Sequence, residues 1–143
     1  MTKIIQDFHQ PGTEFLSNFY RYHALHTVEH RYQAAKTLSF TDRKLVFSQK
    51  TPGEAKRLGR LVHLRPDWDS VKDDVMLLLL RRKFSYPVMR QKLLATGDAF
   101  LIEGNKWHDT YWGICRCGRV KCKDSQNKLG VMLMQVRKEL RSL

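Results

Sequence analysis

The sequence predicts a mainly α-helical domain with a few short strands, in the α+β class. Most of the chain falls into segments with helical periodicity, and these segments begin at N-cap residues or prolines. Apolar runs short enough to be strands are few. The composition, 42% hydrophobic and 28% charged, is that of an ordinary soluble globular protein. At 143 residues we expect one compact domain, residues 1–143, with a sizeable core.

The charge balance favours anionic partners. Lys and Arg number 26 against 14 Asp and Glu, so the formal net charge is +12, which suits phosphates or nucleic acid. A basic surface with no specific partner is the alternative, and charge alone does not exclude it. The first residues lack the apolar core of a signal peptide, and the longest apolar run, Val75–Leu80, is too short to span a bilayer. We therefore expect a cytoplasmic protein with no membrane partner.

The N-terminal segment predicts a strand and an apolar turn. Lys3–Phe8 alternates weakly and ends before Pro11 and Gly12. In the following aromatic run, Ser17 and Asn18 introduce turn chemistry into an apolar setting. Packing is the default role of the neighbouring phenylalanines, whereas the amide of Asn18 is a possible ligand contact.

Thr27 is a plausible N-cap for a helix from Val28 to about Ser39. One face of this helix is an apolar stripe of Val28, Tyr32, Ala35 and Leu38. Another face carries an acid, an amide and an amine at i, i+4 and i+7: Glu29, Gln33 and Lys36. These three side chains form either a solvent-exposed face or one wall of a polar pocket, and spacing alone favours the exposed face.

Three further helices are expected in the middle of the chain. A short one covers Asp42–Phe47, and Thr51-Pro52-Gly53-Glu54 begins the next as a capping box with Pro at the first helical position. Gly59 falls inside this predicted helix, where a glycine lowers helix stability unless another part of the protein packs closely against it. Pro66-Asp67 opens a third helix, which ends in the basic residues 81–83 and whose inward stripe is Trp68, Val71, Val75, Leu78 and Leu79.

Two helices are predicted in the C-terminal part. One begins at Pro87 and ends near Thr96, with Gly97 as its C-cap. The other is capped by Asn127. Its sustained amphipathic stripe is Leu129, Leu133, Val136, Leu140 and Leu143.

The loop between these helices has the composition of a functional site. A short buried strand, residues 100–102, precedes it. The loop, residues 103–113, contains two carboxylates, a histidine, a tyrosine and two tryptophans: Glu103, Asp109, His108, Tyr111, Trp107 and Trp112. Carboxylates can stabilise a developing cation, and indole rings can stack on a planar heterocycle. The alternative is that the tryptophans anchor the loop to the core and the acids are solvated.

Three cysteines, Cys115, Cys117 and Cys122, follow this loop. An odd number within so short a segment does not suggest a secreted disulfide framework. Together with His108 they suggest a zinc site, but the C-x-C-x4-C spacing is not a common structural-zinc pattern. We therefore expect free thiols on a loop, and no metal and no cofactor.

Taken together, several segments of this sequence resemble the NADAR family, and in particular its bacterial branch, the riboflavin-biosynthesis-intermediate N-glycosidases. They occur in the family's order over residues 15 to 140. One departure is Ser125, which stands where the family's G-x-N-x-L-G run begins with Gly. The matching segments are residues 15–19, 28–30 with Gln33 and Lys36, 54–60, Trp68 with residues 71–72 and 75–76, 83–84, 94–97, 101–103, 109–113, and 127–130 with 133–134.

The resemblance implies a compact, largely helical fold that cleaves an N-glycosidic bond on a phosphorylated ribose. Family members act on phosphoribosylamino-pyrimidine intermediates of riboflavin synthesis or remove ADP-ribose from modified guanine. Carried over residue by residue, the polar pocket would hold Glu29, Lys36, Glu103, Asp109 and Trp112, with Asn18, Gln33 and Asn127 as neighbours.

Such a reaction needs a carboxylate near the sugar, a group that assists the leaving nitrogen, and cations for the phosphate. Glu103 and Asp109 are candidates for the first task. Lys36, with Glu29 on its face, could bind phosphate, donate a proton or attack as an amine nucleophile. The remaining candidates contact the substrate, by stacking on the base or holding phosphate: Trp107, Trp112, Lys56, Arg60 and Lys83.

The expected partner is thus a phosphorylated ribosyl small molecule or ADP-ribosylated nucleic acid. A competing hypothesis is a non-catalytic module that binds ADP-ribose or nucleic acid, with the aromatic loop as a stacking platform. The sequence does not indicate an oligomeric state.

Overall fold

The computed structural model describes residues 2–143, which form two compact units. One unit is Asn18–Lys83, and the other combines the residues up to Ser17 with Phe84–Leu143. Helices dominate both units and the strands are two residues long, so the predicted mainly helical α+β class is confirmed. The expectation of a single domain over the whole chain stays a prediction.

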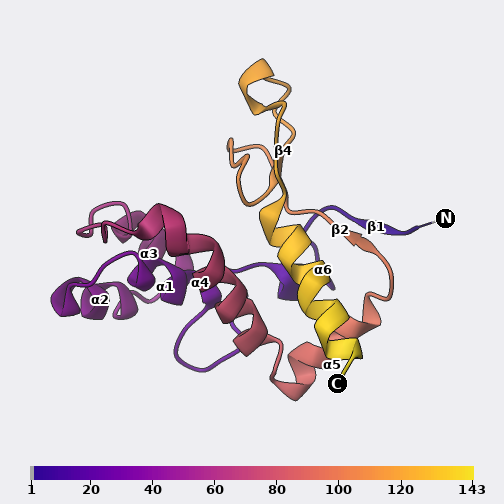
Figure 1. The fold of residues 1–143 in the computed structure, drawn as a ribbon, viewed down its shortest axis with the longest axis horizontal. Helices are drawn as coiled ribbons and strands as arrows, with labels where there is room; N and C mark the ends of the chain where they lie inside the picture. The colour runs from indigo at the N-terminus through magenta and orange to yellow at the C-terminus, as the bar shows by residue number, and fades with distance from the viewer. Residues whose placement is uncertain (1) are drawn as a thin grey trace. The chain divides into compact units, whose positions relative to one another are not determined.

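The unit Asn18–Lys83 is a four-helix arrangement built around α1, as Figure 1 shows. Its helices are α1 (Val28–Ala35), α2 (Phe40–Phe47), α3 (Pro52–Leu58) and α4 (Trp68–Lys83). Helix α1 contacts each of the other three. A small apolar core lies between α1, α2 and α3, formed by Ala34, Val46 and Ala55 with Phe47, Leu58 and Val62 around them. This packing fixes the position of the polar face of α1 within the unit.

Helices α1 and α3 begin where the sequence signals place them, whereas α2 begins earlier than predicted, at Phe40 instead of Asp42, and α1 ends earlier than predicted. The hydroxyl oxygen of Thr27 accepts the His30 N–H at 3.2 Å, and that of Thr51 accepts the Glu54 N–H at 3.1 Å. Helix α1 ends at Ala35 instead of Ser39. The reason is that Ser39 caps α2, and its hydroxyl accepts the Asp42 N–H at 3.2 Å. Leu38 therefore lies outside the helix and is 63% exposed, so its place in the predicted apolar stripe was wrong.

Helix α4 buries a different set of residues from the predicted stripe. Trp68 and Leu79 are buried as expected, but Leu78 is 59% exposed. Met76, Leu80 and Lys83 are buried on α4 instead. The predicted stripe therefore combined residues from two faces of this helix, of which one is buried. Basic residues do occupy its last turn, as predicted.

The second unit contains two short parallel strand pairs and two longer helices. Strand β1 (Ile4–Ile5) pairs with β2 (Phe100–Leu101), and β3 (Gly104–Asn105) pairs with β4 (Ile114–Cys115). The strands are shorter than predicted, and Phe100 is 44% exposed rather than buried. The other elements are η1 (Glu14–Leu16), α5 (Pro87–Ala95), η2 (Val120–Cys122) and α6 (Lys128–Arg141).

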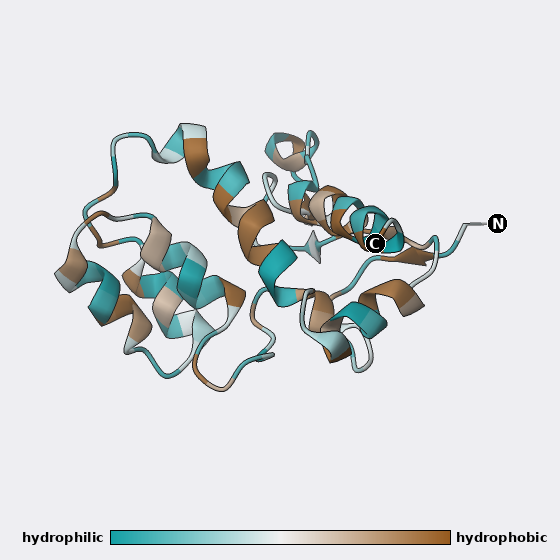
Figure 2. Ribbon diagram, turned by 60° about the horizontal axis from the view of Figure 1, so that its bottom comes forward, coloured by the Kyte–Doolittle hydropathy of each residue, from teal (hydrophilic) through white to brown (hydrophobic). Residues whose placement is uncertain are grey.

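Helix α6 is the amphipathic helix of this unit. Figure 2 shows hydrophobic and hydrophilic residues side by side along it. Its buried apolar side chains include Leu129, Leu133, Val136 and Leu140, as predicted, whereas Leu143 follows the end of the helix and is 85% exposed. The helix packs against α5 and β2. Among residues 2–143, no helix has the length and apolar character needed to cross a membrane.

Candidate functional site

Glu29, Gln33 and Lys36 form a polar cluster on α1, which we call the α1 polar cluster. The amide nitrogen of Gln33 donates to a carboxylate oxygen of Glu29 at 2.6 Å. Glu29 is 7% exposed and Gln33 is 3% exposed. The interpretation of this face as solvated was therefore wrong. A carboxylate held this deeply needs polar partners, because burying a charge without them is costly.

Gly59 makes room for the α1 polar cluster. It ends α3, and a Cβ at this position would collide with the side-chain amide of Gln33. The close packing that the sequence required of this glycine is thus supplied by Gln33. The spacing on α1 predicted the polar face, but no sequence signal linked it to Gly59.

The amine of Lys36 is partly buried beside the ring of Tyr32, with its Nζ 5.8 Å from the ring centroid. Burial lowers the pKa of Lys36, and the nearby Glu29 carboxylate opposes this by favouring the charged form. The positive charges of Arg60, Lys56 and Lys72 lower the pKa further. Because the lowering effects prevail, Lys36 is neutral more often at a given pH than an exposed lysine.

Replacing Gly59 by Ala should destabilise the protein by about 1–3 kcal/mol, the usual cost of overpacking a buried position. Ala itself suits the helical backbone of Gly59, so the expected loss comes from displacing Gln33 from Glu29. Gly53→Ala is the matched control, since this glycine lies in the same helix and its Cβ would meet nothing closer than the Thr51 hydroxyl at 4.0 Å. Chemical denaturation of both variants measures the effect, and equal stabilities would contradict it.

The other candidates of this unit differ in accessibility. The side-chain nitrogen of Asn18 lies 3.6 Å from the Met76 sulfur, and its backbone oxygen accepts the Glu29 N–H at 3.1 Å. Arg60 is exposed and Lys56 is half-buried. Lys83 is fully buried, with its amine near the Tyr20 and Tyr22 rings, and burial lowers its pKa to about 7. Among these cations, Lys56 and Arg60 are the ones accessible to a phosphate.

In the second unit, Glu103 lies buried at the start of the aromatic loop. Its backbone N–H donates to the side-chain oxygen of Asn127 at 3.0 Å. The ring nitrogen Nε2 of His9 lies 3.4 Å from a carboxylate oxygen of Glu103. The same histidine ring contacts Trp107, which is otherwise 53% exposed, with the ring centroids 5.4 Å apart. The sequence did not single out His9. This residue comes close to the aromatic loop because β1 pairs with β2, and no local sequence pattern indicates that pairing.

Asp109 organises the loop through its carboxylate. One carboxylate oxygen accepts the backbone N–H of Tyr111 at 3.1 Å and that of Trp112 at 2.9 Å. Asn105, also missed from sequence, closes the loop behind it: its side chain donates to the Asp109 carbonyl at 2.8 Å and accepts the Asp109 N–H at 3.1 Å. The rings of Tyr111 and Trp112 pack edge to face at 4.8 Å. Asp109 therefore holds the aromatic residues in place as well as carrying a charge.

The same loop caps α6 with its carbonyl groups. Lys128 and Leu129 donate their N–H groups to the carbonyls of Tyr111 at 3.1 Å and Trp112 at 2.9 Å. These are donors that a helix leaves without intrahelical partners. Asn127 occupies the N-cap position but makes no side-chain cap, contrary to expectation. Its buried amide instead joins the Glu103 N–H to the Leu101 carbonyl, at 3.0 Å each.

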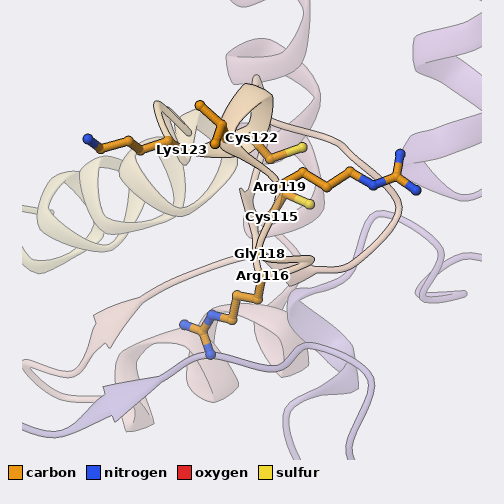
Figure 3. Close-up of a pocket in the computed structure, with 7 residues that line it drawn as sticks. Cys115, Arg116, Gly118, Arg119, Cys122 and Lys123 are labelled. Atoms are coloured by element: carbon orange, nitrogen blue, oxygen red, sulfur yellow. The ribbon is translucent and has the colours of Figure 1, made fainter.

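Cys115, Cys117 and Cys122 form no disulfide, and they are not dispersed along the loop. The structure gathers Cys115, Cys117 and Cys122 around His108. Figure 3 shows this region, where the sulfurs of Cys115 and Cys122 point the same way. The surrounding side chains of Arg116, Arg119 and Lys123 spread outward.

Comparisons with known proteins agree with the fold and with the motifs. The NADAR domain model matches residues 5–141. An N-glycosidase of Nostoc punctiforme is 42% identical over 82% of this chain and 75% of its own length. N-glycosidase YbiA of Escherichia coli is 39% identical over 80% of this chain and 69% of its own. The NMR structure of E. coli YbiA superposes with a TM-score of 0.83 at 33% identity, covering 99% of this chain and 88% of that one.

A plant relative carries the same segment within a longer protein. The chloroplastic riboflavin biosynthesis protein PYRR of Zea mays is 39% identical over 80% of this chain, which corresponds to 19% of the plant protein. With these relatives, the fold and the motifs define a hydrolase that acts on N-glycosyl bonds. The chain belongs to the NADAR family.

Proposed function

We propose that this protein hydrolyses the ribosyl C1–N bond of a phosphorylated ribose compound, with phosphoribosylamino-pyrimidine intermediates of riboflavin biosynthesis as the substrate class. The names of its N-glycosidase relatives support the reaction type, and that of PYRR supports the pathway. The structural observation that carries the proposal is the Lys36 amine. Burial lowers its pKa, although the buried Glu29 carboxylate nearby favours its charged form.

An amine with a lowered pKa can act as a covalent catalyst on a ribosylamine. Opening of the ribose ring breaks the C1–O4 bond, the ring oxygen takes a proton from water, and an iminium ion forms at C1 that still carries the base nitrogen. Neutral Lys36 attacks C1, a proton passes from the lysine nitrogen to the base nitrogen, the C1–N bond to the base breaks, and the base leaves as an amine. The resulting imine between Lys36 and C1 is hydrolysed by water, which returns the free lysine and the free sugar phosphate. Glu29 stabilises the positive charge that forms on these nitrogens.

The remaining proposed roles concern charge and recognition. Glu103 and Asp109 stabilise the cationic character that develops at the sugar, while Trp107 and Trp112 stack on the base. Lys56 and Arg60, which are near enough to Lys36 to lower its pKa, bind the phosphate group. Gln33 holds Glu29 in place through the hydrogen bond of 2.6 Å.

A second candidate substrate is ADP-ribosylated guanine in DNA. The observation that favours it is a run of exposed cations beyond the aromatic loop, Arg116, Arg119, Lys121 and Lys123. Exposed cations in one segment suit the phosphates of a polynucleotide, and binding through them weakens steeply with salt.

A product assay distinguishes these possibilities. The protein is incubated separately with a phosphoribosylamino-pyrimidine and with a DNA duplex that carries ADP-ribosyl-guanine, and released ribose phosphate or ADP-ribose is measured by mass spectrometry. We expect faster release from the pyrimidine compound. Faster release from DNA would support the second candidate, and binding without release from either would support a non-catalytic module instead.

A further inference from the structure

The four side chains His108, Cys115, Cys117 and Cys122 converge to a degree that free thiols on a loop would not require. One ligand atom from each lies within 4.8 Å of all the others. The Nδ1 atom of His108 is 3.4 Å from the sulfur of Cys122 and 3.8 Å from that of Cys115. Figure 3 shows the sulfurs of Cys115 and Cys122 on the same side of the segment.

These distances match those between the ligand atoms of a tetrahedral zinc site. Zinc–sulfur bonds of about 2.3 Å and zinc–nitrogen bonds of about 2.0 Å place tetrahedral sulfur and nitrogen ligands about 3.5 Å apart. The two sulfur–nitrogen distances, 3.4 and 3.8 Å, lie on either side of this value. Three cysteines and one histidine are also a donor set used in structural zinc sites.

The backbone is arranged to bring the ligands together. Gly118 has a positive φ of +83°, which allows the tight turn after Cys117. In that turn the Arg119 N–H donates to the Cys117 sulfur at 3.4 Å, a contact that stabilises a thiolate. The parallel pairing of β3 with β4 fixes Cys115 opposite Asn105. Sequence spacing alone does not reveal this site, because the pairing and the turn bring the ligands together.

Two further observations indicate a built site. His108 has a φ of +71°, a backbone conformation that is uncommon for a non-glycine residue and persists where its surroundings hold it. Ser125 ties the two ends of the cysteine segment together, since its hydroxyl accepts the Cys115 N–H and donates to the Cys122 carbonyl, at 3.0 Å each. This serine occupies the position at which the sequence departs from the family's Gly.

The charges around the cluster are those that a zinc–thiolate site would need. Three thiolates and a neutral imidazole around Zn²⁺ have a net charge of −1. The segment contains one acid, Asp124, and four exposed cations, Arg116, Arg119, Lys121 and Lys123. The four cations compensate the negative charge of the complex.

We propose that His108, Cys115, Cys117 and Cys122 bind one zinc ion in a closed, tetrahedral structural site. Each cysteine coordinates as a thiolate, so binding releases the proton of every cysteine that is still protonated, and the imidazole coordinates in its neutral form. With four protein ligands the metal has no open position for catalysis. Its role is to order the segment next to Asp109 and Trp112. This site is independent of the N-glycosidase reaction proposed above.

Cobalt uptake tests the site directly on the wild-type protein. After metal is removed with a chelator and a reductant, the protein is titrated with CoCl₂ and its absorption spectrum is recorded. We expect saturation at one cobalt per chain, intense ligand-field bands of tetrahedral cobalt and a sulfur-to-cobalt charge-transfer band. Zinc should then displace the cobalt stoichiometrically. No uptake, or a weak spectrum without sulfur-to-cobalt charge transfer, would overturn the proposal.

Variants assign the ligands. Cys122→Ser and His108→Ala should each weaken cobalt binding by more than about 100-fold, the upper range for loss of groups that merely support a metal ligand. His63→Ala is the control for the histidine, because His63 is an exposed residue outside the cluster. An equal loss in His63→Ala, or unchanged binding in His108→Ala, would contradict the ligand assignment.

Thiol alkylation gives a readout that does not depend on a variant's folding. In the metal-free wild type, iodoacetamide should modify Cys117, the least buried of the three cysteines, whereas one equivalent of zinc should protect it. Disulfide formation or unchanged alkylation of Cys117 in the presence of zinc would also overturn the proposal.

Discussion

Lys36→Arg is expected to lower kcat/KM by about 100- to 1,000-fold, within the range seen when a positioned acid–base or nucleophilic group is lost. Arginine keeps the positive charge next to Glu29, but it is not deprotonated in proteins and cannot form the imine. The proposed phosphate contacts of Lys56 and Arg60 remain in this variant. We therefore expect product binding to persist, measured by calorimetry with the sugar phosphate.

Lys44→Arg is the matched control, because Lys44 is an exposed lysine on α2 of the same unit. It should retain wild-type kinetics. Full activity of Lys36→Arg would leave only a charge-based role for this residue. Borohydride reduction during turnover should add the mass of the sugar phosphate to Lys36 of the wild type, and an absence of any adduct would argue against the covalent step.

The pH profile follows from the direction of the Lys36 pKa shift. Burial makes the neutral amine available at lower pH than in an exposed lysine, whose pKa is about 10.4. In the wild type, kcat/KM should rise with pH as Lys36 loses its proton, and the midpoint of the rise should lie below that value. A profile that falls as Lys36 deprotonates would instead indicate a proton donor.

The polar face of α1 shows what helical periodicity can predict and what it cannot. Spacing at i, i+4 and i+7 correctly placed Glu29, Gln33 and Lys36 together. It could not decide between solvent and burial, because that depends on α3, where Gly59 packs against Gln33. The same limit explains Leu38, whose exposure follows from the early start of α2 and not from the pattern of α1.

The aromatic loop was recognised from its composition, but its internal bonding was not. Asp109 was singled out for its charge, whereas in the structure its carboxylate also holds the N–H groups of Tyr111 and Trp112. Asn127 was assigned a helix cap and a ligand contact, yet its side chain joins the backbones of Leu101 and Glu103. Such bonds link residues that are distant in sequence or lie on irregular backbone, where no periodic signal exists.

A second large loss of activity is expected when the carboxylates of the aromatic loop are replaced. Glu103→Gln and Asp109→Asn should each lower kcat by about 100-fold, as expected for the loss of a group that stabilises charge in the transition state. The amide oxygen that Asp109→Asn introduces can still accept the N–H groups of Tyr111 and Trp112, so the loop should stay ordered. Asp109→Ala removes this acceptor and should also lower stability by about 1–2 kcal/mol.

Glu14→Gln and Asp98→Asn serve as controls for these two substitutions, because both residues are exposed acids in the same unit. Steady-state kinetics and thermal unfolding of all five variants separate loss of charge from loss of structure. A stable Asp109→Asn with wild-type kcat would give Asp109 a purely structural role, since its acceptor oxygen would be retained and its charge would not matter. The same result for Glu103→Gln would remove the loop carboxylates from the proposed mechanism and leave the α1 polar cluster as its chemical centre.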